Sequence, residues 1–97
     1  MIQSFHDTGT EDLFNGKSSR ALRKLLPAGL WKVARRRLEQ LDSAGLLGDL
    51  RVPPGNRLEG LKGRRKGQHS IRINEQFRIC FTWTEHGPTG VGVTDYH

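Results

Sequence analysis

The chain has 97 residues, 34% of them hydrophobic, and a net charge of +6; this length predicts one domain, residues 1–97, with a small core. A single cysteine excludes an internal disulfide and a multi-cysteine metal site, and without a membrane-length apolar run or a signal-peptide layout we expect no membrane association and a cytoplasmic location. The excess of 16 Lys and Arg over 10 Asp and Glu predicts a polyanionic partner, most often nucleic acid, although an acidic protein partner would also fit.

The first quarter of the chain predicts a short strand and a short helix. Residues 1–5 mix apolar and polar side chains as an edge or central strand does. Thr8 and Glu11 have the spacing of a capping box, with Thr8 as the N-cap, and residues 15–16 (Asn-Gly) tolerate the left-handed backbone that ends a helix. Residues 17–24 form a basic linker in this interpretation.

A second helix is predicted between Pro27, which suits a first turn, and Gly45, which is a stop signal. Its apolar residues recur at helical spacing: Leu30, Val33, Ala34, Leu38 and Leu41. The opposite side carries Lys32, Arg35, Arg36 and Glu39. That basic side is either a solvated face of a helix that covers a sheet or a surface that contacts phosphate.

The second half of the chain predicts strands. Residues 46–56 form a loop, residues 56–63 a short strand, residues 64–66 a basic turn and residues 68–74 the next strand. From residue 76 onward, apolar and polar side chains alternate, and a turn cluster at residues 85–90 makes this a hairpin. Strand, two helices and then strands predict an α+β fold, with the helices on one face of a mainly antiparallel sheet.

Cations cluster in these strands and turns. Between residues 57 and 78 they are Arg57, Lys62, Arg64, Arg65, Lys66, Arg72 and Arg78, against two acids, Glu59 and Glu75. If Phe77 and Ile79 face the core, alternation turns Arg78 to the other face. Fixed cations can hold a phosphate and oppose the charge that grows on a reacting phosphorus.

The chain ends on an acid, a phenol and an imidazole: Asp95, Tyr96 and His97. Alternation places Asp95 and His97 on one side and Tyr96 on the other. Tyr96 is either a site residue or a core aromatic with its hydroxyl at the rim. Negative charge from Asp95 and the terminal carboxylate favours protonated His97, which could act as a general acid beside Arg78. The spacing of the four histidines predicts no metal site, and no motif indicates a cofactor.

Several segments carry a resemblance to a known family: the opening MIQSF, DLFNGK, LEQLDSA, LKG, the QFRI strand and the terminal DYH. Together they cover nearly the whole chain, which resembles the HigB toxins of the RelE/ParE superfamily, particularly the GraT-type branch. The resemblance implies a compact RelE-like, microbial-ribonuclease-like α+β fold and a type II toxin that cleaves mRNA in the ribosomal A site. It also implies a HigA-like antitoxin with a helix-turn-helix domain, through which alone the toxin would reach operator DNA.

Carried over by position, the family's functional residues fall on Lys62, Arg78, Asp95, Tyr96 and His97. The resemblance implies that a base helps the ribose 2′-hydroxyl attack phosphorus, Lys62 and Arg78 stabilise the added charge, and Tyr96 or His97 protonates the leaving 5′-oxygen. Some HigB members have a His before LKG, where Glu59 stands here. A carboxylate can act as a base but repels phosphate, so three alternatives stay open: Glu59, the nearby His69, or substrate geometry alone without a base. The RNA-binding surface is expected at Arg57, Arg64, Arg65, Lys66, His69 and Arg72.

Two other functions are compatible with a basic fold of this kind. One is a ParE-like toxin that inhibits a topoisomerase without cutting RNA, and the other is a non-enzymatic RNA-binding module. The terminal DYH favours a nuclease over a pure binder. The RNA-binding module would use paired exposed aromatic side chains for stacking, whereas Phe77, Phe81 and Trp83 are expected in the core.

Overall fold

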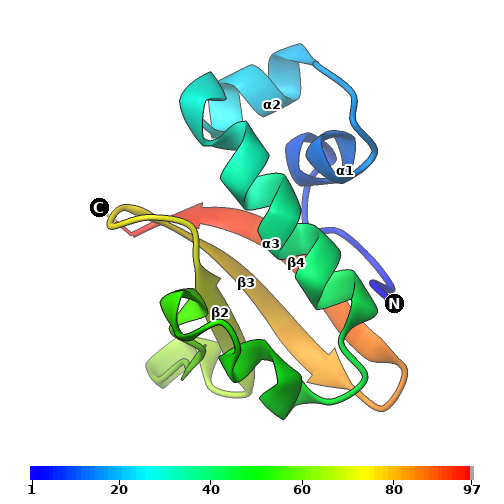
Figure 1. Cartoon of the computed structure of the whole chain (residues 1–97), viewed down its shortest axis with the longest axis vertical. Helices are drawn as coiled ribbons and strands as arrows, with labels where there is room; N and C mark the ends of the chain where they lie inside the picture. Colours follow the sequence, from blue (N-terminus) through cyan, green and yellow to red (C-terminus); the bar gives the residue numbers. More distant parts are fainter. Residues whose placement is uncertain (97) are drawn as a thin grey trace.

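The computed structural model describes residues 1–96, in which three helices gather on one side of a four-stranded antiparallel sheet (Figure 1). The helices are α1 (Thr8–Phe14), α2 (Arg20–Leu25) and α3 (Trp31–Ser43). The strands are β1 (Glu59–Gly60), β2 (Gln68–Arg72), β3 (Phe77–Thr84) and β4 (Gly87–Asp95), adjacent in that order. Short 3-10 turns are η1 (Ala28–Leu30), η2 (Leu47–Arg51), η3 (Pro54–Asn56) and η4 (Gly63–Arg65). The predicted α+β class is confirmed.

The core lies between α3 and the sheet. Antiparallel pairing places Ile71, Ile79 and Val93 side by side on the face toward the helices. The buried hydrophobic cluster consists of Leu13, Leu22, Leu26, Ala34, Leu38, Leu41, Leu50, Ile71, Ile73, Phe77, Ile79, Phe81, Val91 and Val93. Within residues 1–96, none of the helices combines the length and apolarity that a membrane crossing needs.

The opposite face of the sheet, here called the open face, carries the residues that alternate with the core positions. Cross-strand partners share a face, so the register places on it Glu59, Ser70, Arg72, Arg78, Cys80, Gly92 and Thr94. This face is where the predicted cations of the strands meet.

The N-terminal third differs from the sequence-based prediction in two elements. Residues 1–5 run beside β4 but form only a single parallel bridge, Phe5 to Val91, instead of a strand. The predicted basic linker contains α2, which begins where the Ser19 hydroxyl accepts a 3.1 Å hydrogen bond from the Leu22 amide. Burial of Leu22 stabilises this short helix. The segment is amphipathic, and its many basic residues led to the prediction of a linker.

Local backbone geometry explains two further differences. The N-cap of α1 is Asp7, whose carboxylate accepts a 2.7 Å hydrogen bond from the Thr10 amide, and Thr8 is the first helical residue. The predicted strand over residues 56–63 shrinks to Glu59–Gly60, because Arg57 (φ 45°) and Gly63 (φ 65°) have left-handed backbone that a strand excludes.

Candidate functional site

Arg78 lies on the open face at β3, on the opposite side from Phe77 and Ile79 as alternation predicted, yet only 9% of it is exposed. Its Nε donates to the Ser70 hydroxyl at 2.7 Å, and its Nη2 donates to the carbonyl oxygens of Ser70 (3.3 Å) and Arg57. All of these acceptors are neutral. Within residues 1–96 no carboxylate forms an ion pair with Arg78, so its charge remains available.

The hydrogen bonds of Arg78 leave one guanidinium nitrogen, Nη1, for a ligand. An arginine has five N–H donors in a planar fork, and three of those of Arg78 are occupied by Ser70 and Arg57. Within residues 1–96, no hydrogen bond occupies the two donors of Nη1. These two N–H groups diverge, so each can donate to a separate acceptor such as a phosphate oxygen, and Arg78 is a fixed anion-binding group.

A pocket of about 430 Å³ surrounds this guanidinium. We call it the arginine pocket; its lining consists of Arg57, Glu59, Arg72, Asn74, Glu75, Arg78 and Tyr96. Three guanidinium groups outnumber two carboxylates there. The pocket therefore combines anion attraction with a carboxylate and a phenol that can exchange protons.

The backbone carbonyl of Arg57 contacts Arg78 because hydrogen bonds from the buried Asn56 side chain hold the preceding loop. Asn56 is fully buried, and its Nδ2 donates to the carbonyl oxygens of Leu50 (3.1 Å) and Val52 (3.5 Å). Arg57 then adopts left-handed backbone at the end of η3, with φ 45°. The loop thus orients a carbonyl toward Arg78 while the Arg57 side chain lines the pocket.

Tyr96 follows β4 and is 44% exposed, so it is not a core aromatic. Its hydroxyl lies 3.8 Å from the Cys80 sulfur, and Nη1 of Arg65 donates to the same sulfur at 3.3 Å. Burial and the contact with Cys80 raise the pKa of the Tyr96 phenol, although the charges of Arg65 and Arg78 oppose this. A phenol with a raised pKa keeps its proton at neutral pH and can donate it.

The other terminal residues are placed differently. Asp95 pairs with Phe77 across β3 and β4, on the opposite side of the strand from Tyr96, and its Oδ2 accepts a 3.1 Å hydrogen bond from Gln76 Nε2. His97 lies outside the described residues. Of the terminal residues expected beside Arg78, Tyr96 lines the same pocket as Arg78, whereas Asp95 lies on the opposite side of the strand.

The predicted basic surface divides in two. Arg57 and Arg72 line the arginine pocket, and Arg65 reaches across to Cys80. Lys62, Arg64 and Lys66 are exposed around η4 and do not line that pocket. Lys62, which was expected to hold a phosphate together with Arg78, therefore does not share the arginine pocket with it.

His69, predicted as an RNA-binding residue and as an alternative base, lies on the other face of the sheet from Arg78. His69 pairs with Phe81, and its ring stacks on the Phe81 ring with centroids 6.3 Å apart, on the face toward the helices. Its Nδ1 is buried and has no hydrogen-bond partner among residues 1–96. Glu59, which pairs with Ser70, is the candidate base that shares the arginine pocket.

Sequence reasoning did not identify Ser70 or Cys80 as site residues, although a signal existed. In QHSIRIN, alternation groups His69 with Ile71 and Ile73 on the core side and Ser70 with Arg72 on the other.

Among residues 1–96, no three His, Cys, Asp or Glu side chains are grouped so that they could hold a metal ion.

Comparisons with known proteins show which family the chain resembles. A family model described as the RelE-like toxin of type II toxin–antitoxin system HigB matches residues 3–97. The chain is 44% identical over 96 residues to Toxin HigB-1 of Vibrio cholerae, covering 99% of this chain and 94% of that protein. It is 36% identical over 58 residues to an uncharacterised protein of Haemophilus influenzae, covering 60% of this chain and 57% of that protein.

A solved structure is similar in fold. The YoeB-YefM complex from Staphylococcus aureus matches with a TM-score of 0.61 and 18% identity, over 100% of this chain and 98% of the matched chain. At this identity the similarity concerns the fold alone.

Proposed function

Because the chain belongs to the HigB-like family of RelE-like toxins of type II toxin–antitoxin systems, we propose that it is a ribosome-dependent endoribonuclease that cuts mRNA in the ribosomal A site and so inhibits translation. The observation that supports this most is Arg78. It is a charged group that neutral acceptors hold in place, in a pocket shared with a protonated phenol. Phosphodiester cleavage needs a fixed positive charge and a proton donor of this kind.

The proposed chemistry is an internal displacement at phosphorus. Glu59 takes the proton of the ribose 2′-hydroxyl, and the 2′-oxygen bonds to the adjacent phosphorus. Arg78 stabilises the additional negative charge, with Arg65 and Arg72 as neighbouring cations. The bond from phosphorus to the 5′-oxygen breaks, and Tyr96 or His97 gives that oxygen a proton. The products are a 2′,3′-cyclic phosphate and a 5′-hydroxyl end.

We infer dependence on the ribosome because only some of the predicted site residues line the arginine pocket. Lys62 and Asp95 do not line the arginine pocket, so orientation of the substrate must come largely from elsewhere. Holding reactants in a reactive geometry contributes as much as about 7–11 kcal/mol to lowering a barrier, and a ribosome can hold the mRNA in that way. We therefore expect little cleavage of free RNA.

As a toxin of a type II system, the protein has an antitoxin partner. The more specific proposal is a HigA-like antitoxin with a helix-turn-helix domain, which would carry the toxin to operator DNA. The toxin would act in the cytoplasm, where its ribosomal target is.

The experiment that tests the function is primer extension on an mRNA translated by purified ribosomes, with toxin added. Wild type should produce new 5′ ends within codons, and those ends should accept phosphate from polynucleotide kinase without prior phosphatase treatment. Arg78→Lys keeps the charge but loses the fork, and should reduce cleavage by on the order of 10²–10³ while ribosome binding is mostly retained. Arg23→Lys on α2, an exposed cation away from the pocket, is the control.

Two outcomes would contradict the proposal. Equal cleavage of free RNA would remove the dependence on the ribosome. Growth arrest with intact mRNA would favour the topoisomerase inhibitor instead. Comparing Tyr96→Phe with a variant that lacks His97 then separates the two candidate proton donors.

A further inference from the structure

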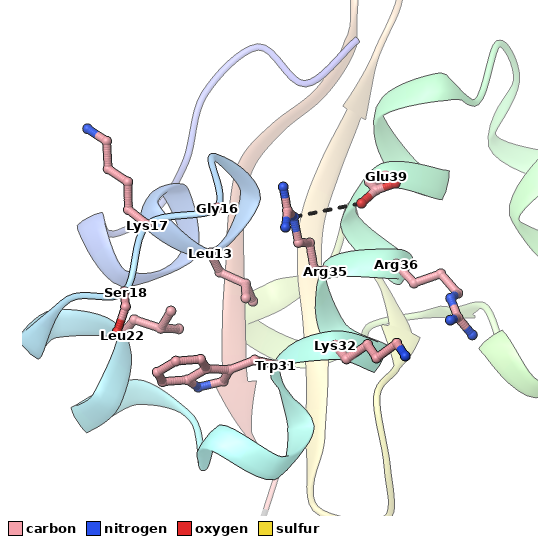
Figure 2. A pocket seen from close by; sticks show the side chains of 10 residues that line it. All are labelled: Leu13, Gly16, Lys17, Ser18, Leu22, Trp31, Lys32, Arg35, Arg36 and Glu39. Atoms are coloured by element: carbon pink, nitrogen blue, oxygen red, sulfur yellow. Dashed lines mark ion pairs between the residues drawn. The ribbon is translucent and has the colours of Figure 1, made fainter.

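A second pocket, here called the helix pocket, lies among the three helices, on the other side of the molecule's sheet from Arg78. Its volume is about 420 Å³. Figure 2 shows its lining, which comes from the end of α1 and the residues that follow it, from Leu22 in α2, and from α3 between Trp31 and Glu39. It shares no lining residue with the arginine pocket, so the mechanism proposed above does not use it.

The base of the helix pocket is apolar and rigid. Leu13 and Leu22 are 3% and 1% exposed, and half-buried Trp31 forms one wall. The Trp31 Nε1 donates to the Leu26 carbonyl oxygen at 2.8 Å, which satisfies the polar atom of the indole and fixes the ring. An aromatic wall already held in place contributes strongly to binding a partner, because little side-chain freedom is lost.

The rim of the helix pocket is cationic. Figure 2 shows Lys17 at the end of α1 and three cations on α3: Lys32, Arg35 and Arg36. The one acid in the lining, Glu39, lies 3.8 Å from Arg35 Nε, and these two side chains are 64% and 49% exposed. So exposed a pair holds Arg35 only weakly, and positive charge predominates around an apolar floor.

Arg35 is also positioned for a ligand. Gly16, which has left-handed backbone (φ 74°), brings the end of α1 so close that a Cβ there would lie 3.0 Å from Arg35 Nη2. The Arg35 guanidinium therefore lies against the backbone of Gly16, two residues after the end of α1, at the edge of the pocket. This packing restricts a side chain that would otherwise move freely in solvent.

We propose that the helix pocket docks an acidic segment of the antitoxin, with an apolar side chain seated against Trp31 and Leu22 and carboxylates paired with Lys32 and Arg35. The identity of the partner depends on the function proposed above, whereas the chemistry of the segment follows from the pocket. The two leucines and the indole form an apolar surface that can bind an aliphatic or aromatic side chain. Single-stranded RNA would instead need a series of aromatic faces for successive bases.

Docking at this site leaves the open face uncovered by the bound segment, because the two pockets lie on different elements. Toxin activity and antitoxin binding should therefore be separable by mutation. The informative variant is Lys32→Glu with Arg35→Glu: both side chains are exposed, so the fold should persist, which thermal unfolding would check. Arg23→Glu with Lys24→Glu makes the same charge change on exposed residues of α2 outside the pocket and is the matched control.

The test measures binding of the purified full-length antitoxin by calorimetry, alongside toxicity and mRNA cleavage for each variant. The pocket variant should bind at least about 100-fold more weakly, stay toxic and resist neutralisation, while the control behaves as wild type. Unchanged antitoxin affinity in the folded pocket variant would overturn the proposal. So would loss of affinity for a single-stranded RNA oligonucleotide with antitoxin binding intact. If wild type binds antitoxin through this pocket but cleaves no mRNA, the nuclease function fails and the docking site stands.

Discussion

Tyr96 shows how placement and protonation act together in one residue. It lies at the rim of the arginine pocket, where its hydroxyl is 3.8 Å from the Cys80 sulfur. A neutral phenol donates a proton, whereas a phenolate cannot. Since burial raises the pKa of Tyr96 above its ordinary value of 10.0, the donating form predominates at every pH at which ribosomes function.

The corresponding prediction is that Tyr96→Phe lowers the single-turnover rate of mRNA cleavage by about 10²–10⁴ and leaves stability nearly unchanged, because the side chain is exposed. Activity that needs the protonated phenol is present below its pKa and is lost as pH rises through it. A fluorinated tyrosine at position 96, with a more acidic phenol, should bring this loss to lower pH. Cleavage by Tyr96→Phe at the wild-type rate would leave His97 as the donor.

Arg57 contributes through its backbone as well as its charge. Its carbonyl accepts a hydrogen bond from Arg78, and its φ of 45° is one that glycine adopts easily and a β-branched residue does not. We expect Arg57→Gly to fold with near-wild-type stability and lose only one cation. Arg57→Val should destabilise the fold by about 1–3 kcal/mol and cleave less mRNA. Urea unfolding and the cleavage assay together check this; equal stability of the two variants would contradict it.

The extent to which such residues could be predicted depends on whether their position follows from alternation. Alternation along residues 76–84 placed Arg78 opposite the core, and this is correct. The same rule places His69 with Ile71 and Ile73, on the opposite face from Arg78, so a role for His69 at the arginine pocket does not follow from alternation. The carbonyl of Arg57 could not be foreseen, because nothing in the sequence marks an arginine for left-handed backbone.

At the scale of elements, α1 is joined to the sheet through one buried hydroxyl. Thr10 is fully buried in α1, and its Oγ1 accepts a 3.1 Å hydrogen bond from the Val93 amide in β4. The same β4 leads directly to Tyr96. The helix therefore supports the end of the strand that presents the candidate proton donor.

Replacing that hydroxyl tests the connection. Thr10→Val has nearly the same shape but leaves the Val93 amide without an acceptor in a buried place, so we expect a loss of about 1–3 kcal/mol in the free energy of unfolding by urea. Thr8→Val changes an exposed residue and should remain within about 0.5 kcal/mol of wild type. Equal stabilities for these variants would mean that Thr10 does not join α1 to β4.

Helices and strands were predicted correctly where the apolar residues followed one clear periodicity. The bounds of β3 and the apolar face of α3 follow from period-two and helical spacing. The helix α2 was missed because six residues give little periodicity and its Arg and Lys resembled a linker. The predicted strand over residues 56–63 was too long because the left-handed backbone at Arg57 and Gly63 interrupts it, and the contact of the Arg57 carbonyl with Arg78 is distant in sequence.

At the scale of the whole molecule, the charge of +6 is shared between two surfaces with different surroundings. On the open face, guanidinium groups stand beside a carboxylate and a phenol, as polyanion chemistry requires. Around the helix pocket, cations surround an apolar seat, which suits a peptide. Neither alternative for the basic side of α3, a solvated face or a phosphate-contacting surface, is decided by the fold; our docking proposal adds contact with carboxylates and leaves phosphate contacts to the sheet.

This division predicts how salt affects RNA binding. For a single strand, the slope of log affinity against log salt concentration is about −0.7 per neutralised phosphate. In the Tyr96→Phe background, for which we expect slow cleavage, Arg65→Ala should make the slope shallower by about 0.7, because Arg65 lies over the open face beside Cys80. Arg36→Ala, on the rim of the helix pocket, should leave the slope unchanged. Fluorescence anisotropy with a labelled oligonucleotide over a salt series measures both, and equal effects would mean that RNA contacts the helices as well as the sheet.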